Sequence, residues 1–144
     1  MRMSAVRNLV LVAMLVAGMA TARAQDLASR FDPARDAARD VATAAATAKA
    51  QGKRVLVDVG GEWCSWCHIL DRFVAENGDV RGLVDAGYVW VKVNWSKENK
   101  NEALLSRWPK IDGYPHLFVL DGDGKLLHSQ NTGASVICHL TSFC

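Results

Sequence analysis

Residues 54–67 read RVLVDVGGEWCSWC and carry most of the structural information in the chain. The first six are almost wholly apolar and rich in valine, which predicts a short strand buried on both faces. Gly60–Gly61 ends that strand. Cys64 and Cys67 then open a segment in which the apolar residues of 69–74 recur at helical spacing. The sequence therefore predicts a strand, a turn and a helix that begins at the cysteines.

The rest of the chain alternates helices with strands. Asp32 and Pro33 predict the N-cap and the first residue of an alanine-rich helix that continues to Ala50. Further patterns predict helices at 64–76, 80–86 and 98–108, a strand at 88–93, and a hairpin of strands 117–120 and 125–129. This order predicts an α/β domain with a mixed sheet and helices on both of its faces.

The first 24 residues have the layout of a secretory signal peptide. A short basic start is followed by an apolar run at 9–17 and by the small-x-small triplet Ala22–Ala24. The apolar run is shorter than the ~20 residues that span a bilayer. We therefore predict cleavage after Ala24, a mature domain at 25–144, export to the periplasm or the medium, and membrane contact only through the signal.

The charge of the predicted mature chain is nearly balanced. Three of the 17 basic residues and none of the 15 acidic ones lie in the signal, which leaves 14 against 15. No cluster of lysine or arginine remains that would bind nucleic acid. We therefore predict no nucleic-acid partner.

The C-x-x-C pair has the spacing and position of a redox site. A cysteine at a helix N-terminus lies at the positive end of the helix dipole, among unpaired N–H groups, and both stabilise the attacking thiolate. Cys67 is then near enough to resolve a mixed disulfide formed on Cys64. The regular helix and strand signals differ from those of a disulfide-stapled small protein. The motif predicts a thiol–disulfide oxidoreductase.

Two other interpretations of the motif stay open. A binding module would hold a metal ion or a client protein through Cys64, Cys67 and His68 without turnover. A c-type haem protein would use the literal C-x-x-C-H motif, but it needs a second axial ligand, and all four methionines lie in the predicted signal. We predict neither a cofactor nor a bound metal ion.

Residues 54–67 resemble the strand and active-site segment of the thioredoxin-like family, and further matches follow in the family's order. The resemblance covers residues 53–133 and points to exported bacterial thioredoxin-domain proteins. It implies a thioredoxin fold, with a mixed central sheet flanked by helices. The matching positions are Asp58, Glu62, Trp63, Cys64, Cys67, Val91–Asn94, Gly113–Pro115 and Gly133.

The resemblance implies three roles near the cysteines. Asp58 would be a buried carboxyl group that takes the proton from Cys67, since burial raises the pKa of a carboxylic acid; an aspartate at a strand end that faces solvent is the alternative. Lys92 would be the charge partner of Asp58, or else a solvated lysine. Pro115 would be cis and present backbone to a substrate, although trans is the default for proline.

Aromatic residues near the motif predict a surface for partner proteins. Trp63 and Trp66 flank the cysteines, and aromatic anchors are common at interfaces. We predict substrate contacts for these two and for Tyr114, with core packing as the alternative for Trp63. His68 would tune the thiolates or be a polar residue of the first helical turn.

The predicted partners follow from export and from the family. They are protein thiols and disulfides of the cell envelope, with a membrane thiol relay as the electron donor and disulfide reduction as the favoured direction. After Gly133 the chain departs from the family, because only residues 134–144 stand where a full amphipathic helix is expected. We predict a shortened or atypical C-terminal helix, with Cys138 and Cys144 paired, bridged to another chain or free.

Overall fold

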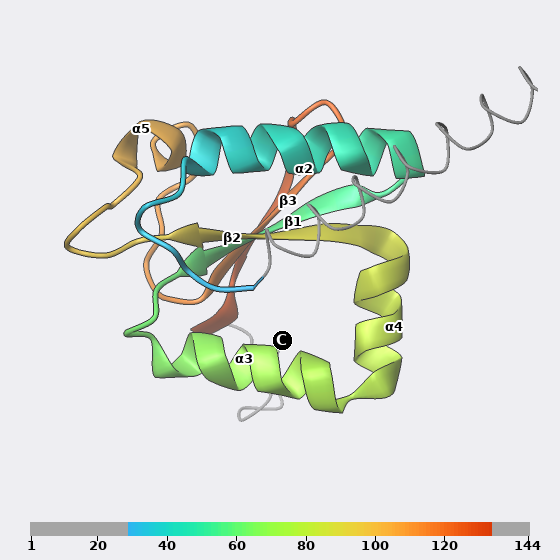
Figure 1. The fold of residues 1–144 in the computed structure, drawn as a ribbon, viewed down its shortest axis with the longest axis horizontal. Coiled ribbons are helices and arrows are strands. Elements are labelled where there is room, and N and C mark those ends of the chain that lie inside the picture. Colours follow the sequence, from blue (N-terminus) through green and yellow to red (C-terminus); the bar gives the residue numbers. More distant parts are fainter. Residues whose placement is uncertain (1–28, 134–144) are drawn as a thin grey trace, which may run out of the picture.

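Four strands form the centre of the molecule in the order β2-β1-β3-β4. The computed structural model describes residues 29–133 (Figure 1). Strand β1 (Arg54–Gly60) pairs in parallel with β2 (Tyr88–Asn94) and antiparallel with β3 (His116–Leu120), which in turn pairs antiparallel with β4 (Leu126–Asn131). The sheet is therefore mixed, as predicted.

Helices cover both faces of this sheet (Figure 1). Helix α2 (Ala37–Gln51) lies on one face and α3 (Ser65–Glu76) on the other. Helix α4 (Gly78–Gly87) connects α3 to β2, and the short α5 (Glu102–Leu105) follows β2. No helix in the described range is both long and apolar enough to cross a membrane.

Successive side chains of the strands point to opposite faces of the sheet, and the two faces differ in composition. Val55, Val57 and Val59 of β1 are fully buried in the core cluster that contains the buried side of α2. Because successive side chains of a strand point to opposite faces, Asp58 points to the face that α3 covers. The strand therefore supplies an apolar core on one side and a titratable group on the other.

The alanine-rich helix begins four residues later than predicted. Asp36, not Asp32, is its N-cap, and the Asp36 carboxylate accepts a hydrogen bond of 3.0 Å from the Arg39 backbone N–H. Asp32 instead accepts a 2.9 Å hydrogen bond from the backbone of Ala34, in the turn before the helix. Both aspartates precede good helix formers, and the turn at Asp32 delays the start. The helix ends at Gln51, within one residue of the predicted end, and Gly52 follows with a φ of 65°.

The predicted helix at 98–108 is wrong in extent, since only Glu102–Leu105 is helical. Asparagine side chains bind the preceding backbone into a loop. Asn94 donates to the carbonyl of Asn99 at 2.8 Å, and Asn101 donates to the carbonyl of Asn94 at 2.7 Å. Asn101 has a φ of 49°, which a helix does not contain. These local bonds compete with helix formation. The predicted signal and the segment 134–144 lie outside the described residues.

Candidate active site

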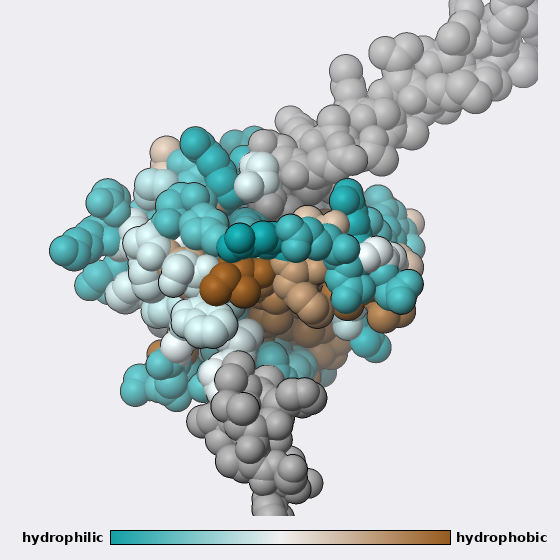
Figure 2. All heavy atoms as spheres, turned by 90° about the horizontal axis from the view of Figure 1, so that it is seen from below, coloured by the Kyte–Doolittle hydropathy of each residue, from teal (hydrophilic) through white to brown (hydrophobic). Residues whose placement is uncertain are grey.

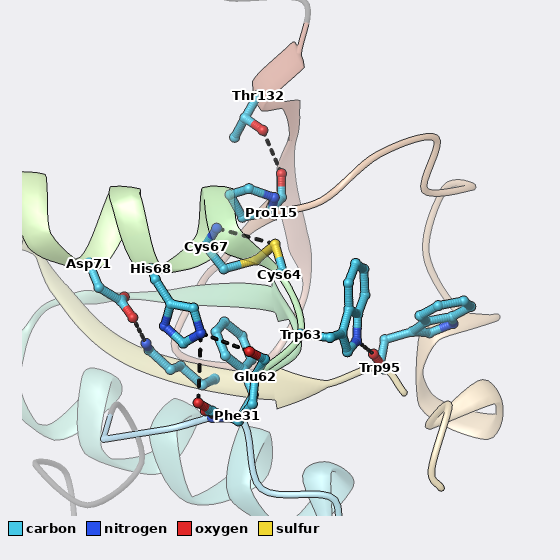
Figure 3. The surroundings of a disulfide bond; sticks show 11 residues. Phe31, Glu62, Trp63, Cys64, Cys67, His68, Asp71, Trp95, Pro115 and Thr132 are labelled. Atoms are coloured by element: carbon cyan, nitrogen blue, oxygen red, sulfur yellow. Dashed lines mark hydrogen bonds and ion pairs between the residues drawn. A yellow bond between two sulfur atoms is a disulfide. The ribbon is translucent and has the colours of Figure 1, made fainter. Parts of the chain in front are cut away.

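Cys64 and Cys67 form a disulfide at the start of α3, with Cα atoms 5.3 Å apart (Figure 3). Cys64 is the N-cap of the helix, and its sulfur accepts a 3.2 Å hydrogen bond from the backbone N–H of Cys67. Both side chains are buried, Cys67 completely. The first turn of the helix therefore directs an N–H group at the sulfur that would carry a thiolate.

Gly60 makes room for the buried sulfur. A Cβ atom at this position would overlap Cys67 Sγ and press on the Phe31 ring at 3.1 Å. Phe31 is itself buried in a small cluster with both cysteines. Sequence reasoning missed Phe31, because it lies in a segment without helix or strand periodicity. The last residue of β1 and the segment before α2 thus enclose the disulfide.

Asp58 lies on β1, two residues before Gly60. It is fully buried, and neither carboxylate oxygen has a hydrogen-bond partner. Asp58 and Gly60 point to the same face of the strand, about 7 Å apart along it, and Gly60 abuts Cys67. Burial raises the pKa of Asp58 to about 7; Lys92 opposes this rise, Asp71 adds to it, and the nearby Trp90 indole opposes it slightly. The group can therefore hold or release a proton near neutral pH.

Lys92 is almost completely buried and bonds directly to Asp71 of α3, rather than to Asp58. It is the register partner of Asp58 on the neighbouring strand, and its ammonium group lies 4.6 Å from the centre of the Phe31 ring. Its charge still lowers the pKa of Asp58. Asp71 escaped the sequence analysis, although it stands one helical turn after Cys67.

Pro115 faces the disulfide from the loop before β3 (Figure 3). The Tyr114–Pro115 peptide bond is cis, as the resemblance implied. The carbonyl of Pro115 accepts a 2.6 Å hydrogen bond from the hydroxyl of Thr132. This bond ties the proline to the segment that follows β4.

Aromatic rings border the disulfide on one side. Trp63 is 55% exposed, and its indole N–H donates to the Trp95 carbonyl at 2.8 Å. Its ring makes edge contacts with Trp95 and Tyr114, whose rings stack with centroids 5.0 Å apart. Trp66 is 62% exposed on the first turn of α3. Trp95 was not singled out in the sequence, because nothing in a single tryptophan after a strand marks it as part of this cluster.

An apolar groove of about 540 Å³ runs along α3 beside the disulfide. We call it the α3 groove. Figure 2 shows apolar side chains gathered on this side of the molecule. No charged side chain lines it; the residues that do are Trp66, Ile69, Leu70, Phe73, Gly113, Tyr114, Pro115, Thr132 and Gly133.

His68 turns away from the cysteines toward Glu62. Its Nε2 lies 2.9 Å from the Glu62 carbonyl oxygen and 3.8 Å from the Glu62 carboxylate. That carboxylate accepts a 2.8 Å hydrogen bond from the Phe31 backbone N–H. Among residues 29–133, no three side chains of histidine, cysteine, aspartate or glutamate are grouped so as to hold a metal ion.

A family model described as thioredoxin-like matches residues 36–122. The chain belongs to the thioredoxin-like family. A disulphide isomerase from Xylella fastidiosa has a similar structure, with a TM-score of 0.65 and 26% identity over 77% of this chain and 86% of that one. The C-terminal domain of Neisseria meningitidis DsbD is similar in fold, with a TM-score of 0.55 and 22% identity over 71% of this chain and 85% of that one.

Two curated proteins are similar in sequence. One is the thiol:disulfide interchange protein DsbD of Colwellia psychrerythraea, 28% identical over 57% of this chain and 14% of its own length. The other is the disulfide bond reductase DsbH of Chlamydia pneumoniae, 25% identical over 47% of this chain and 45% of its own length. The chain spans less than half of each relative. At the level of enzyme class, the prediction of a thiol–disulfide oxidoreductase with the Cys64–Cys67 pair is confirmed.

Proposed function

We propose that this protein reduces disulfides of exported proteins, with Cys64 as the attacking sulfur, Cys67 as the resolving sulfur and Asp58 as the proton acceptor. One observation carries the proposal. A disulfide caps the N-terminus of α3, and the strand beside it carries a buried carboxyl group with no hydrogen-bond partner two residues before Gly60, the residue that abuts Cys67.

The reaction balances with these three groups. In the dithiol form, the Cys64 thiolate attacks a client disulfide, forms a mixed disulfide and releases one client thiolate. The Cys67 thiol gives its proton to Asp58, whose pKa of about 7 suits this transfer. The Cys67 thiolate then attacks Cys64 Sγ and expels the second client thiolate. The client gains two electrons, and the protein reaches the disulfide form seen here.

The surroundings of the pair favour the reducing direction. An oxidising protein of this fold is strong because its dithiol form is stabilised. Here the buried titratable group on the adjoining strand is the carboxyl of Asp58, which opposes a nearby thiolate once it ionises. Two candidate cations are engaged elsewhere: Lys92 is bonded to Asp71, and His68 faces Glu62. Neither side chain therefore adds to the stabilisation that the helix N-terminus gives the thiolate, which supports a pair that gives up its electrons readily.

The place of action is part of the proposal. The predicted signal at residues 1–24 supports export, and the names of the relatives describe disulfide interchange and reduction. In an oxidising envelope a reductase needs a continuous supply of electrons. We propose protein thiols and disulfides of the envelope as clients, and a membrane thiol relay as the donor.

The first experiment is thiol trapping with intact-mass analysis across a graded glutathione redox buffer. We expect a reversible change of two thiols at Cys64 and Cys67, at a potential nearer to about −270 mV than to about −120 mV. A second assay follows insulin reduction driven by dithiothreitol. Cys64→Ser should reduce this rate to the uncatalysed background, whereas the matched variant Cys138→Ser should keep it. A pair that never cycles, or metal or haem in the purified protein, would support a binding role instead.

A further inference from the structure

We propose that Phe31 is a positioning residue of the redox site, whose ring keeps water away from Cys67 and Asp58. Glu62 holds this ring in place. The shielding sets the pH range in which the cysteine pair works, and this last part alone rests on the proposed function. Neither Phe31 nor Glu62 gives or takes an electron or a proton in the reaction.

The ring of Phe31 packs against the buried parts of the site. Phe31 is 1% exposed and belongs to one cluster with the two cysteines. A Cβ atom at Gly60 would meet both Cys67 Sγ and, at 3.1 Å, the ring of Phe31. The ammonium group of Lys92 lies 4.6 Å from the centre of the ring. The ring is therefore in contact with the end of β1, the buried sulfurs and the lysine of β2.

Asp58 depends on this cover. It lies on the same face of β1 as Gly60 and is the register partner of Lys92, so the ring of Phe31 packs against a neighbour of Asp58 along the strand and another across the sheet. The two carboxylate oxygens of Asp58 are buried and have no hydrogen-bond partner among the described residues. Water that reached them would favour the ionised form. Burial is also the main cause that raises the pKa of Asp58 to about 7.

The titratable and charged groups around Asp58 come from three elements. Lys92 of β2 lowers the pKa of Asp58, and Asp71 of α3 raises it. Helix α3 also supplies Cys67, and Tyr114 of the loop before β3 packs against the cluster that contains this cysteine. The partner of Asp58 on β3 is uncharged. Substituting the shielding ring leaves all these groups in the chain, so a changed pH dependence reports the loss of the cover.

Glu62 fixes the position of Phe31. The chain around Phe31 is neither helix nor strand, so side chains must hold it. The Glu62 carboxylate accepts a 2.8 Å hydrogen bond from the Phe31 backbone N–H, and the Asn99 amide donates to the Pro33 carbonyl at 2.9 Å. Glu62 lies two residues before Cys64, so the first of these bonds ties the shielding segment to the active-site turn (Figure 3).

Alkylation of Cys67 tests the shielding directly. All samples carry Cys64→Ser, Cys138→Ser and Cys144→Ser, so that Cys67 is the single thiol. Intact mass gives the rate with iodoacetamide at its alkaline plateau, where the thiol is ionised in every variant. We expect Phe31→Ala to react at least about 10-fold faster than the parent, because an open path replaces rare local opening. Phe31→Leu keeps an apolar cover and should react at nearly the parent rate.

Two further positions separate shielding from stability. The side chain of Glu62 is 54% exposed, so Glu62→Ala should fold even if Phe31→Ala does not, and should raise the alkylation rate several-fold. Glu62→Gln keeps an oxygen that accepts the hydrogen bond and should stay near the parent. Leu120→Ala leaves a cavity on the α2 face and should not raise the rate.

The rate–pH curve for insulin reduction tests the second part of the proposal, with all four cysteines in place. In Phe31→Ala the midpoint should fall by about one pH unit, because water moves the pKa of Asp58 toward its ordinary value. Phe31→Leu and Leu120→Ala should both keep the parent midpoint.

The two measurements have separate outcomes. Equal alkylation rates in the parent, Phe31→Ala and Glu62→Ala would overturn the shielding, as would an equal acceleration in Leu120→Ala. Faster alkylation with an unmoved midpoint would refute the control of the pH range and leave the shielding in place. If no variant reduces insulin at all, the proposed function fails and the pH part fails with it, while the alkylation rates still decide the shielding.

Discussion

The two faces of the sheet are built from the same strands but serve different purposes. Toward α2, the strands present Val55, Val57, Val91 and Phe118, all fully buried. Toward α3, the alternate positions present titratable groups, above all Asp58 and its register partner Lys92. The period of two thus lets one strand stabilise the fold and hold a reactive group at once.

The two helices differ in the same way. Helix α2 buries small side chains, with Ala44 and Ala48 completely covered, so that it packs close to the valines. Helix α3 buries only Cys67 and leaves Phe73 half exposed. We infer that packing on the α2 face contributes most of the stability. The α3 face contributes less, because its residues serve the redox reaction and the binding of client proteins.

Asp58→Asn should produce the largest change in stability. It would measure how much unfolding free energy the buried carboxyl group on the α3 face costs. The native group titrates near pH 7, and an unfolded aspartate near 3.8. Between these values the native state binds the extra proton, so stability falls as pH rises and levels off above pH 7. The shift is roughly three units at about 1.4 kcal/mol each. Relative to the parent, the oxidised variant should therefore gain about 4 kcal/mol in unfolding free energy between pH 4 and pH 8.

Urea denaturation of the oxidised parent and variant at both pH values measures this gain. Comparing two pH values cancels the pH-independent cost of burying an amide. The same variant should slow insulin reduction at pH 7, because Cys67 loses its proton acceptor. If the parent and Asp58→Asn differ in stability by the same amount at both pH values, the pKa of Asp58 is not raised by folding. The buried carboxyl group then does not lower the stability of the protein at neutral pH.

Leu120→Ala tests the α2 face and should destabilise the protein by about 3 kcal/mol, the usual cost of such a cavity. Leu120 is fully buried in the core cluster that includes the buried residues of α2. The glutathione redox potential of the cysteine pair should stay the same, because the substitution lies on the opposite face. Urea denaturation and thiol trapping measure the two quantities. A shifted potential would mean that the faces are coupled.

The sequence was sufficient to predict those elements in which the hydrophobic pattern and a chemical motif lie in the same segment. The apolar run of β1 and the C-x-x-C motif predicted the strand, the helix and the disulfide pair at its N-terminus. It was insufficient where neighbouring residues compete for one role. Asp32 and Asp36 are equally good caps on paper, and a turn decides between them.

Long-range partners were also beyond the sequence. The bond between Lys92 and Asp71 joins β2 to α3, and Phe31 reaches the disulfide from the segment before α2. Asp71 and Phe31 have no periodic or motif signal, and the sequence analysis paired Lys92 with Asp58 instead. They become visible only once the chain is folded, because packing and not spacing brings them together.

Asp71→Asn should have a smaller effect, confined to the pH profile. The charge of Asp71 raises the pKa of Asp58, so removing it should move the midpoint of the rate–pH curve for insulin reduction to lower pH. Lys92, freed from its partner, adds to this direction. Asp79→Asn is the matched control, because Asp79 is exposed on α4 and should leave the midpoint in place. An unmoved midpoint in Asp71→Asn would mean that Asp71 only positions Lys92.

Trp66→Ala should have the smallest effect on stability. It tests whether a residue of the α3 face can contribute to the binding of a client protein without contributing to folding. Trp66 is 62% exposed, and exposed positions of this kind usually change the unfolding free energy by no more than about 0.5 kcal/mol. Its ring lines the end of the α3 groove beside the disulfide, so a protein client loses an aromatic anchor while a small thiol does not. We expect KM for insulin to rise several-fold, with the dithiothreitol exchange rate and the urea midpoint unchanged. Arg72→Ala on the same helix, outside the groove, should change none of the three. A loss of stability in Trp66→Ala would instead mean that the ring packs as part of the core. Helix α3 would then stabilise the fold by packing, as α2 does.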